Sequence, residues 1–325
     1  MPIITSPQEF NTEDLYVDLR PVIGTELLLK CEGFNFAGSI KLKAAAAMVE
    51  QAERSGLLHH GSVLVESSSG NLGVALAMIA ANKGYRFLCV TDTRCNLGTR
   101  RLMETMGAEV YTVTQPDAEG GYLAARLDHV RRLCASDARY VWLNQYTNVN
   151  NWEAHHRTTA PAIAERFPGL DVLFVGAGTT GTLMGCARYF RARGRPVTIV
   201  AVDVEGSVTF GGPARARMIP GLGAGVRPQL LDRSYLDDVV IVSEAETIRM
   251  CRRFARSGYL FGGSTGTVVA GAQRWLARYR PDTPVTAVAI SPDLGERYLD
   301  TVYQKSWVDD VYGDAVYDAD QAEVR

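Results

Sequence analysis

The chain alternates short apolar runs with longer segments in which apolar residues recur every three or four positions. The short runs predict strands, and the longer segments predict amphipathic helices. Predicted strands lie at 62–67, 85–92, 108–114, 140–146, 171–176, 197–203 and 285–293. Predicted helices lie at 70–84, 97–107, 121–135, 158–167, 182–194, 243–258 and 265–279. This alternation predicts an α/β fold in which helices cover both faces of parallel, twisted sheets.

Two segments fall outside the alternation. Residues 204–228, "VEGSVTFGGPARARMIPGLGAGVRP", are rich in glycine and read as a long loop of the kind that is usually functional or mobile. Residues 309–325 hold six acidic residues and one basic residue and read as a surface tail.

Composition narrows the function classes. A length of 325 residues predicts two domains or one large α/β unit, and a net charge of −2 disfavours nucleic acid and anionic membranes as partners. No apolar run reaches the roughly 18 residues of a membrane span, and the first residues lack the pattern of a secretory signal. The scattered cysteines read as free thiols, so we expect a cytoplasmic protein without disulfides or a metal site.

The stretch "DVLFVGAGTTGTLMG" (171–185) places a G-x-G-x-x-G turn directly after a predicted strand. Such a turn aims backbone N–H groups and a helix N-terminus at an anion. With Asp203 further on, the spacing also suits an NAD-binding oxidoreductase, which stays open as a different class of function. Hydroxyl side chains crowd this turn and favour a terminal phosphate instead; they belong to Thr179, Thr180 and Thr182.

A second candidate site lies at "FNFAGSIKLKAAAAMVE" (34–50). Ser39 is a plausible N-cap of an alanine-rich helix, which puts Lys41 in the first helical turn. The helix dipole there favours a neutral amine, as a Schiff-base lysine requires. Lys43 points elsewhere on the helix and reads as a surface lysine.

A third candidate site is "ESSSGNLG" (66–73), which follows a predicted strand and opens a helix. Ser68, Ser69, Gly70 and Asn71 form a second anion-binding turn, rich in hydroxyls and amides. Two such turns and a perturbed lysine suit an aldehyde cofactor that carries a phosphate, together with an amino acid that carries a carboxylate.

With these motifs the chain resembles the fold-type II (β-family) pyridoxal-phosphate enzymes, the group of cysteine synthase and cystathionine β-synthase. The resemblance covers nearly the whole chain. Its motifs are "VIGTELLLK" (22–30), "GSIKLKAA" (38–45), "ESSSGNLG" (66–73), "NQYTNVNNWEAHHRTTAPAI" (144–163), "GAGTTGT" (176–182), "IPGLGAG" (219–225), "FGGSTGT" (261–267) and "LGERYL" (294–299).

The resemblance implies a homodimer whose subunits each have two three-layer αβα domains, a small one at 39–141 and a large one at 1–38 plus 142–325. It implies that Lys41 holds pyridoxal 5′-phosphate and serves as the base, that Asn71 bonds the cofactor's 3′-oxygen, and that Ser264 bonds its ring nitrogen. The implied phosphate cradle is Gly178, Thr179, Thr180, Gly181 and Thr182. The implied binders of the substrate carboxylate are Ser68, Ser69, Asn71 and Gln145. The histidine in the motif at 144–163 is structural in this family, so the resemblance disfavours a metal at His155 or His156.

The implied reaction is β-replacement on an activated L-serine through an aminoacrylate. Segments 120–127 and 207–223 resemble enzymes that join O-phospho-L-serine to L-glutamate on the way to L-2,3-diaminopropionate, for siderophores or other natural products. On this hypothesis Arg126 and Tyr146 hold the leaving phosphate, while Arg215 and Arg217 hold the glutamate carboxylates. Leu72 stands where common cysteine synthases carry threonine, yet synthesis of cysteine or cystathionine stays the alternative. The alternative that each of these arginines is simply a solvent-exposed surface residue also stays open.

Overall fold

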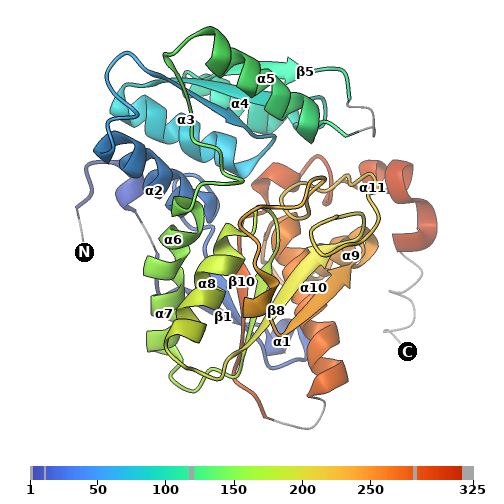
Figure 1. Cartoon of the computed structure of the whole chain (residues 1–325). Helices are drawn as coiled ribbons and strands as arrows, with labels where there is room; N and C mark the ends of the chain where they lie inside the picture. The colour runs from blue at the N-terminus through green and yellow to red at the C-terminus, as the bar shows by residue number, and fades with distance from the viewer. Residues whose placement is uncertain (1–2, 11, 117–120, 281–283, 317–325) are drawn as a thin grey trace.

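The computed structural model describes residues 3–10, 12–116, 121–280 and 284–316. Two sheets organise the chain, each covered by helices on both faces (Figure 1). The α/β class with parallel-rich sheets is therefore confirmed. The end of the acidic tail, 317–325, lies outside the described residues.

The larger sheet has six strands. Their order across the sheet is β1 (Tyr16–Asp18), β2 (Leu28–Cys31), β10 (Ala287–Ser291), β7 (Val172–Gly176), β8 (Thr198–Val204) and β9 (Asp238–Val242). All neighbours pair in parallel except β1 and β2, which pair antiparallel at one edge. The sequence patterns miss β1, β2 and β9, because each is a short run without a helical pattern on both sides.

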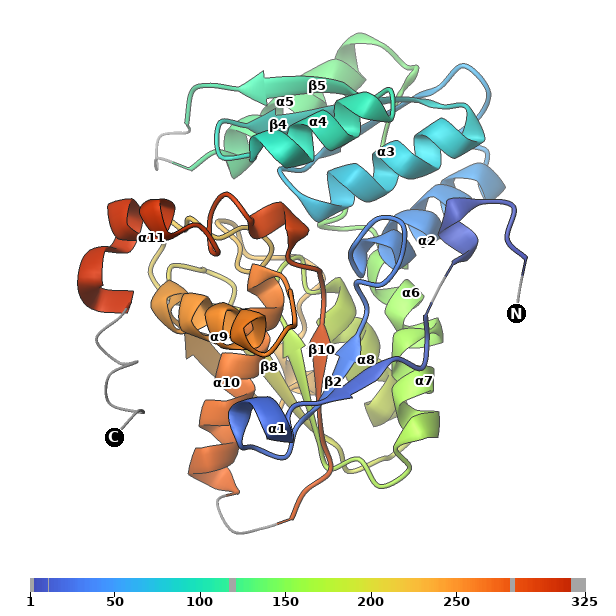
Figure 2. The ribbon, with the colours of Figure 1, turned by 180° about the vertical axis from the view of Figure 1, so that it is seen from behind.

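Helices on the larger sheet form two layers. One face carries α6 (Asn150–Arg157), α7 (Thr159–Arg166) and α8 (Gly181–Ala192), and the other carries α1 (Arg20–Ile23), α9 (Glu244–Arg256) and α10 (Gly263–Tyr279) (Figure 2). Helix α11 (Lys305–Tyr312) packs beside α9. Short 3-10 turns complete the described chain at Pro7–Glu9, Arg233–Tyr235, Glu296–Tyr298 and Gly313–Val316.

The smaller sheet has four parallel strands in the order β5 (Glu109–Val113), β4 (Arg86–Asp92), β3 (Val63–Ser67) and β6 (Tyr140–Trp142). One face packs against α2 (Lys41–Arg54), α3 (Asn71–Lys83) and α4 (Leu97–Thr105), and the other against α5 (Leu123–Ser136). The predicted strand at 140–146 ends early at Trp142, because Asn144 adopts a left-handed φ of 54° and turns the chain. Whether 39–141 moves as a separate domain stays a prediction.

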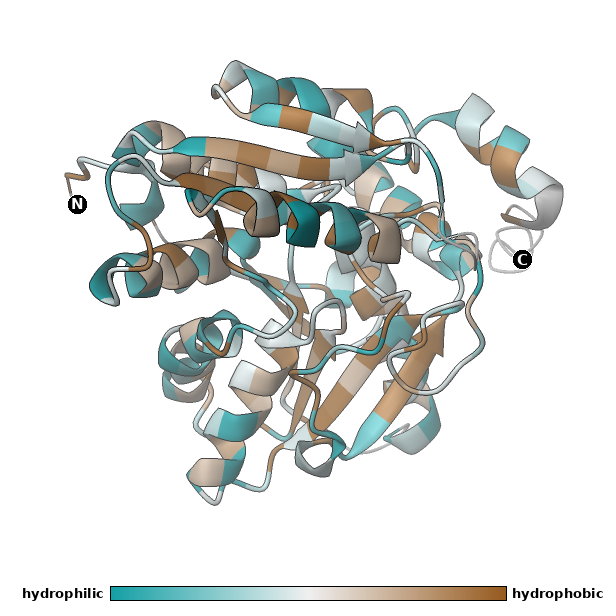
Figure 3. Cartoon of the chain, turned by 45° about the horizontal axis from the view of Figure 1, so that its top comes forward, coloured by the Kyte–Doolittle hydropathy of each residue, from teal (hydrophilic) through white to brown (hydrophobic). Residues whose placement is uncertain are grey.

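Strand β7 shows why these runs are continuously apolar. Val172 and Phe174 contact the α9–α10 layer, while Leu173 and Val175 contact the α6–α8 layer, and all four are buried. Strands buried on both faces cannot alternate polar and apolar residues. Figure 3 shows the same trend, since the strands are largely brown whereas the helices carry both teal and brown residues.

Helices α6 and α8 meet at Gly185, where an added Cβ would lie 2.4 Å from the Trp152 carbonyl oxygen and 2.7 Å from His155 Cβ. We expect Gly185→Ala to force the helices apart and to lower the free energy of unfolding by about 1–3 kcal/mol. Urea unfolding followed by circular dichroism measures this loss.

The matched control is Gly98→Ala in α4, where the nearest atom to an added Cβ is Asn96 Oδ1 at 3.9 Å. Alanine there should leave stability unchanged or raise it by up to about 1 kcal/mol, because it favours the helix. Equal effects of the two substitutions would contradict the proposed close contact.

Candidate active site

The candidate site lies where the carboxyl ends of both sheets face each other. A cleft of about 780 Å³ is lined by residues from both, among them Lys41, Ser68, Ser69, Asn71 and Gln145. Tyr146, Arg126, Arg215 and Arg217 line the same cleft. A narrow cavity adjoins it and is lined by the remaining predicted residues, Thr180, Gly181, Thr182 and Ser264, with Gly178 and Thr179 shared between the two. The fold thus brings every predicted site residue to one place.

The glycine loop forms a cradle that side chains would fill. An added Cβ at Gly178 would lie 3.0 Å from the Gly221 carbonyl oxygen, and one at Gly181 would lie 2.1 Å from Asn151 Oδ1. Thr180 holds a left-handed φ of 66°, which is strained for a β-branched residue. Its buried hydroxyl has no hydrogen-bond partner among the described residues. Strain and an orphaned hydroxyl at a helix N-terminus fit a phosphate group.

Lys41 is the first residue of α2, as predicted, and its Nζ lies 3.3 Å from Thr179 Oγ1 in the cradle. Burial lowers the pKa of Lys41 to about 8, although the Glu66 carboxylate opposes the shift. The predicted cap is wrong: Ile40 occupies the N-cap position, and the buried Ser39 hydroxyl bonds to no described residue. The chain enters α2 through helical backbone at Ile40, which leaves no room for a side-chain cap.

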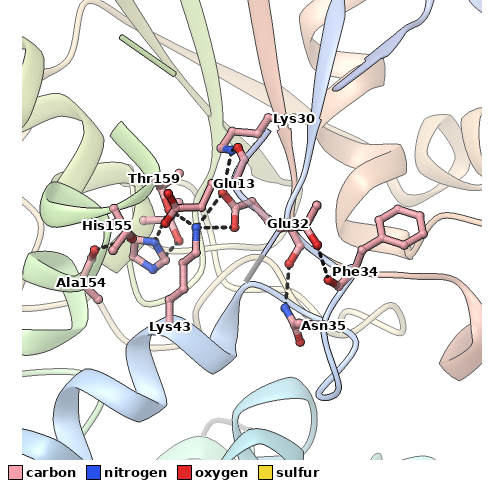
Figure 4. Close-up of polar contacts among 12 residues, drawn as sticks. Glu13, Lys30, Glu32, Phe34, Asn35, Lys43, Ala154, His155 and Thr159 are labelled. Carbon is pink, nitrogen blue, oxygen red and sulfur yellow. Dashed lines mark hydrogen bonds and ion pairs between the residues drawn. The ribbon is translucent and has the colours of Figure 1, made fainter. Parts of the chain in front are cut away.

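Lys43 is not a surface lysine, contrary to the prediction. Its side chain is 9% exposed, and its Nζ lies 2.8 Å from Glu32 Oε2 and 3.3 Å from Thr159 Oγ1 (Figure 4). The reason is that α2 packs between the N-terminal strand region and the α6–α7 corner, so the second face of its first turn is also covered.

The turn after β3 is held by its own side chains. The Ser68 hydroxyl accepts hydrogen bonds from the N–H groups of Gly70 (3.3 Å) and Gly73 (3.0 Å). Gln145 Nε2 donates to the Ser67 carbonyl oxygen at 3.0 Å. This preorders the backbone N–H groups that open α3 toward the cleft.

Glu66 lies beneath this turn and is fully buried. Burial raises the pKa of its carboxyl to about 7, although it accepts hydrogen bonds from Trp142 Nε1 (3.0 Å) and the Gln145 N–H (3.2 Å). The carboxyl therefore ties the turn to β6 and to Gln145 at the same time.

Asn71 and Ser264 belong to a cluster that the sequence analysis did not assign. Asn71 Nδ2 donates to Asp293 Oδ2 at 3.1 Å, and Asn71 Oδ1 accepts from Arg297. Tyr298 donates to the same Asp293 oxygen at 2.5 Å. Burial raises the pKa of Asp293 and that of Tyr298. The motif "LGERYL" marked this region, but its spacing alone gave Arg297 and Tyr298 no role.

Arginines dominate the cleft wall. Arg126 is 8% exposed and its Nε lies 3.2 Å from Asp92 Oδ2, but this Nε makes no hydrogen bond of good geometry to a described residue. Arg215 is exposed, whereas Arg217 is half-buried and donates to the Gly206 carbonyl oxygen at 2.5 Å. Arg94, which the sequence analysis did not select, lies over the Tyr122 ring at 5.1 Å.

Asp203 cannot serve as a ribose-binding acid. It is fully buried and accepts a hydrogen bond from the Val204 N–H at 2.9 Å. Burial raises the pKa of its carboxyl to about 6. This burial removes the structural support for the dinucleotide hypothesis.

The described residues give no grouping of three or more His, Cys, Asp or Glu side chains that could hold a metal ion. His155 is buried against Thr159 and Thr182, while His156 contacts the rings of Trp152 and Tyr189. Within the described ranges, no helix is both long and apolar enough to cross a bilayer.

Comparisons with known proteins agree with this geometry. Residues 9–291 match the family model described as "Pyridoxal-phosphate dependent enzyme". The N-(2-amino-2-carboxyethyl)-L-glutamate synthase of Ralstonia nicotianae is 41% identical over 285 residues, which cover 87% of this chain and 84% of that protein. The enzyme of the same name from Cupriavidus metallidurans is 40% identical over 298 residues, 90% of this chain and 87% of that protein.

Solved structures give the same family. O-ureido-L-serine synthase is 33% identical with a TM-score of 0.83, and the match covers 99% of this chain and 100% of that one. A hydrogen sulfide-producing enzyme from Fusobacterium nucleatum is 30% identical with a TM-score of 0.85, covering 91% and 100%. The chain belongs to the pyridoxal-phosphate-dependent enzymes and is a β-replacement enzyme of the cysteine synthase family.

Proposed function

We propose that the chain joins O-phospho-L-serine to L-glutamate, forming N-(2-amino-2-carboxyethyl)-L-glutamate and phosphate. The C–O bond at Cβ of phosphoserine breaks, and a bond from Cβ to the glutamate amine nitrogen forms. The names of the two relatives support this reaction. The product would supply L-2,3-diaminopropionate for siderophores or other natural products.

The main support for the proposal is the positive charge of the cleft. Its wall includes five arginines, and Asp92 is the one acidic side chain among the described residues that line it. The arginines are Arg94, Arg126, Arg215, Arg217 and Arg297. Phosphoserine and glutamate are both anions, so their combination needs this surplus of positive charge, whereas homocysteine carries no net charge.

The described residues fit pyridoxal 5′-phosphate. The cradle of Gly178, Thr179, Thr180, Gly181 and Thr182 would take its phosphate. Lys41 would hold its aldehyde carbon, Asn71 would bond its 3′-oxygen, and Ser264 would bond its ring nitrogen. When bound, the cofactor supplies an electron sink for loss of the α-proton and of the β-substituent. Ser264 is a neutral partner, which favours β-replacement over transamination.

Side chains of the protein would transfer the proton and bind the substrate. Lys41 Nζ, partly neutral near pH 8, would take the α-proton. The preordered turn at Ser68, Ser69 and Asn71, with Gln145, would grip the substrate carboxylate. Arg126 and Tyr146 would orient the leaving phosphate.

The nucleophile and the assembly complete the proposal. Arg215 and Arg217 would bind the carboxylates of glutamate, and Arg94, which lines the same cleft, would add a further cation. Residues 39–141 would close over the substrate and exclude water. We expect the enzyme to be a cytoplasmic homodimer.

Capture of the cofactor aldehyde requires a neutral amine, so its rate reports the pKa of Lys41. A pKa of about 8 means that the rate of pyridoxal phosphate uptake by apo-protein should rise with pH, be half-maximal near pH 8 and level off above that. With an ordinary lysine the rate would be half-maximal only near about pH 10. Stopped-flow absorbance measures the profile, Lys41→Ala should show no covalent uptake, and a midpoint near pH 10 would contradict the burial of the amine.

The reaction itself is tested by supplying O-phospho-L-serine with glutamate, sulfide or homocysteine in turn. We expect phosphate release to depend on glutamate, and mass spectrometry to show the glutamate adduct. Turnover with sulfide or homocysteine, but not with glutamate, would favour the synthesis of cysteine or cystathionine and sink the proposal.

Arg126→Met should lower kcat/KM for O-phospho-L-serine by about 30- to 100-fold, because a charge-assisted contact with the phosphate is lost. Turnover of O-acetyl-L-serine, which lacks the dianion, should change far less. The matched control is Arg131→Met on the same helix, where the arginine is exposed and pairs with Asp128. Equal losses on both donors would remove Arg126 from phosphate recognition.

A further inference from the structure

A continuous row of buried polar contacts runs from β2 to the phosphate cradle. Figure 4 shows its part from Lys30 to His155. Its members, in order, are Lys30, Glu32, Lys43, Thr159, His155 and Thr182. Lys30 and Thr159 are fully buried, and His155 is 1% exposed. Of these six, only the last member, Thr182, lines the narrow cavity, so the others do not contact a phosphate bound there.

The number of protons on each group fixes which group donates and which accepts along this row. The ammonium of Lys43 has donors and no acceptor, so Thr159 Oγ1 must accept at their 3.3 Å contact. The Thr159 hydroxyl has one proton, and its other contact among the described residues is His155 Nδ1 at 3.1 Å. If His155 Nδ1 carried a proton, the Thr159 proton would be buried without an acceptor, which is costly. Thr159 therefore donates and Nδ1 accepts.

The protonation state of His155 follows from these contacts and from its burial. Burial lowers the pKa of its imidazole well below the usual value, and the nearby Lys43 and Lys41 lower it further, so the ring is neutral at pH 7. A neutral ring with an unprotonated Nδ1 carries its proton on Nε2. Nε2 lies 3.2 Å from Thr182 Oγ1 and donates to it.

We propose that Lys43, Thr159 and His155 are positioning residues that orient the Thr182 hydroxyl so that its proton points into the phosphate cradle. Because Thr182 accepts from His155, its own proton is free for an anion. With the opposite direction of bonding, Thr182 would donate to His155 and present lone pairs to the phosphate. This inference concerns the cofactor, and it holds whichever nucleophile the enzyme uses.

The first test determines which ring nitrogen of His155 carries the proton. In wild-type protein labelled with ¹⁵N-histidine, His155 is assigned by comparison with His155→Gln, and its ring nitrogens are observed by NMR. We expect Nδ1 to be unprotonated and Nε2 to be protonated across pH 6–8, in apo-protein and holoenzyme alike. A proton on Nδ1, or a charged ring, would overturn the proposal without any change to the fold.

The second test separates the phosphate from the rest of the cofactor. Apo-protein is titrated with pyridoxal phosphate and with pyridoxal, which has no phosphate, and binding is followed by visible absorbance. We expect His155→Leu to raise the Kd for pyridoxal phosphate about five- to tenfold and to leave pyridoxal unchanged. His155→Gln can place an amide N–H where Nε2 lies, so it should keep an affinity near that of the wild type.

His156→Leu is the matched control, because this neighbouring histidine contacts the rings of Trp152 and Tyr189 and lies outside the row. It should change neither Kd. Equal losses for both ligands in His155→Leu, or a His155→Gln variant as weak as His155→Leu, would show a merely structural role and overturn the proposal. Thermal unfolding of each apo-variant identifies any loss of fold before the titrations are compared.

Discussion

Parallel pairing constrains this molecule more than any other single interaction. Parallel strands end at one edge of their sheet, and the two sheets turn these edges toward each other. The turn after β3, the glycine loop after β7 and the segment after β10 therefore meet, although they are far apart in the chain. The hydrogen-bond ladders fix these loops, and the apolar runs buried on both faces fix the ladders.

Charge burial is the second constraint. Lys30, Glu32 and Lys43 form a paired set with almost no solvent exposure, and Arg126 pairs with Asp92 at the cleft wall. Such pairs add little net stability, because desolvation offsets their attraction, but breaking one leaves a costly lone charge. The Lys30–Glu32–Lys43 set holds α2, β2 and the α6–α7 corner in one arrangement beneath the cradle, whereas the Arg126–Asp92 pair joins α5 to the end of β4.

The sequence predicts the features that have a local cause. Continuous apolar runs predict β7 and β8, and the glycine spacing predicts the turn that opens α8. Features that depend on distant packing escape it. The spacing of Lys43 from Lys41 shows that the two point apart, but not that Glu32 covers the second face. Likewise, Arg297 reaches Asn71 across 226 positions, and no local pattern encodes such a contact.

The cradle and the cleft wall differ in how freely they can change. The glycines of the cradle are closely packed, because an added Cβ at Gly178 would approach the Gly221 carbonyl oxygen and one at Gly181 would collide with Asn151. The loop at 205–232 has no regular helix or strand and carries Arg215 exposed at its surface. On the proposed role of this loop in binding the nucleophile, its exposed side chains can be replaced without moving the packed glycines of the cradle. Packing therefore restricts substitution in the cradle more strongly than at the exposed positions of the loop.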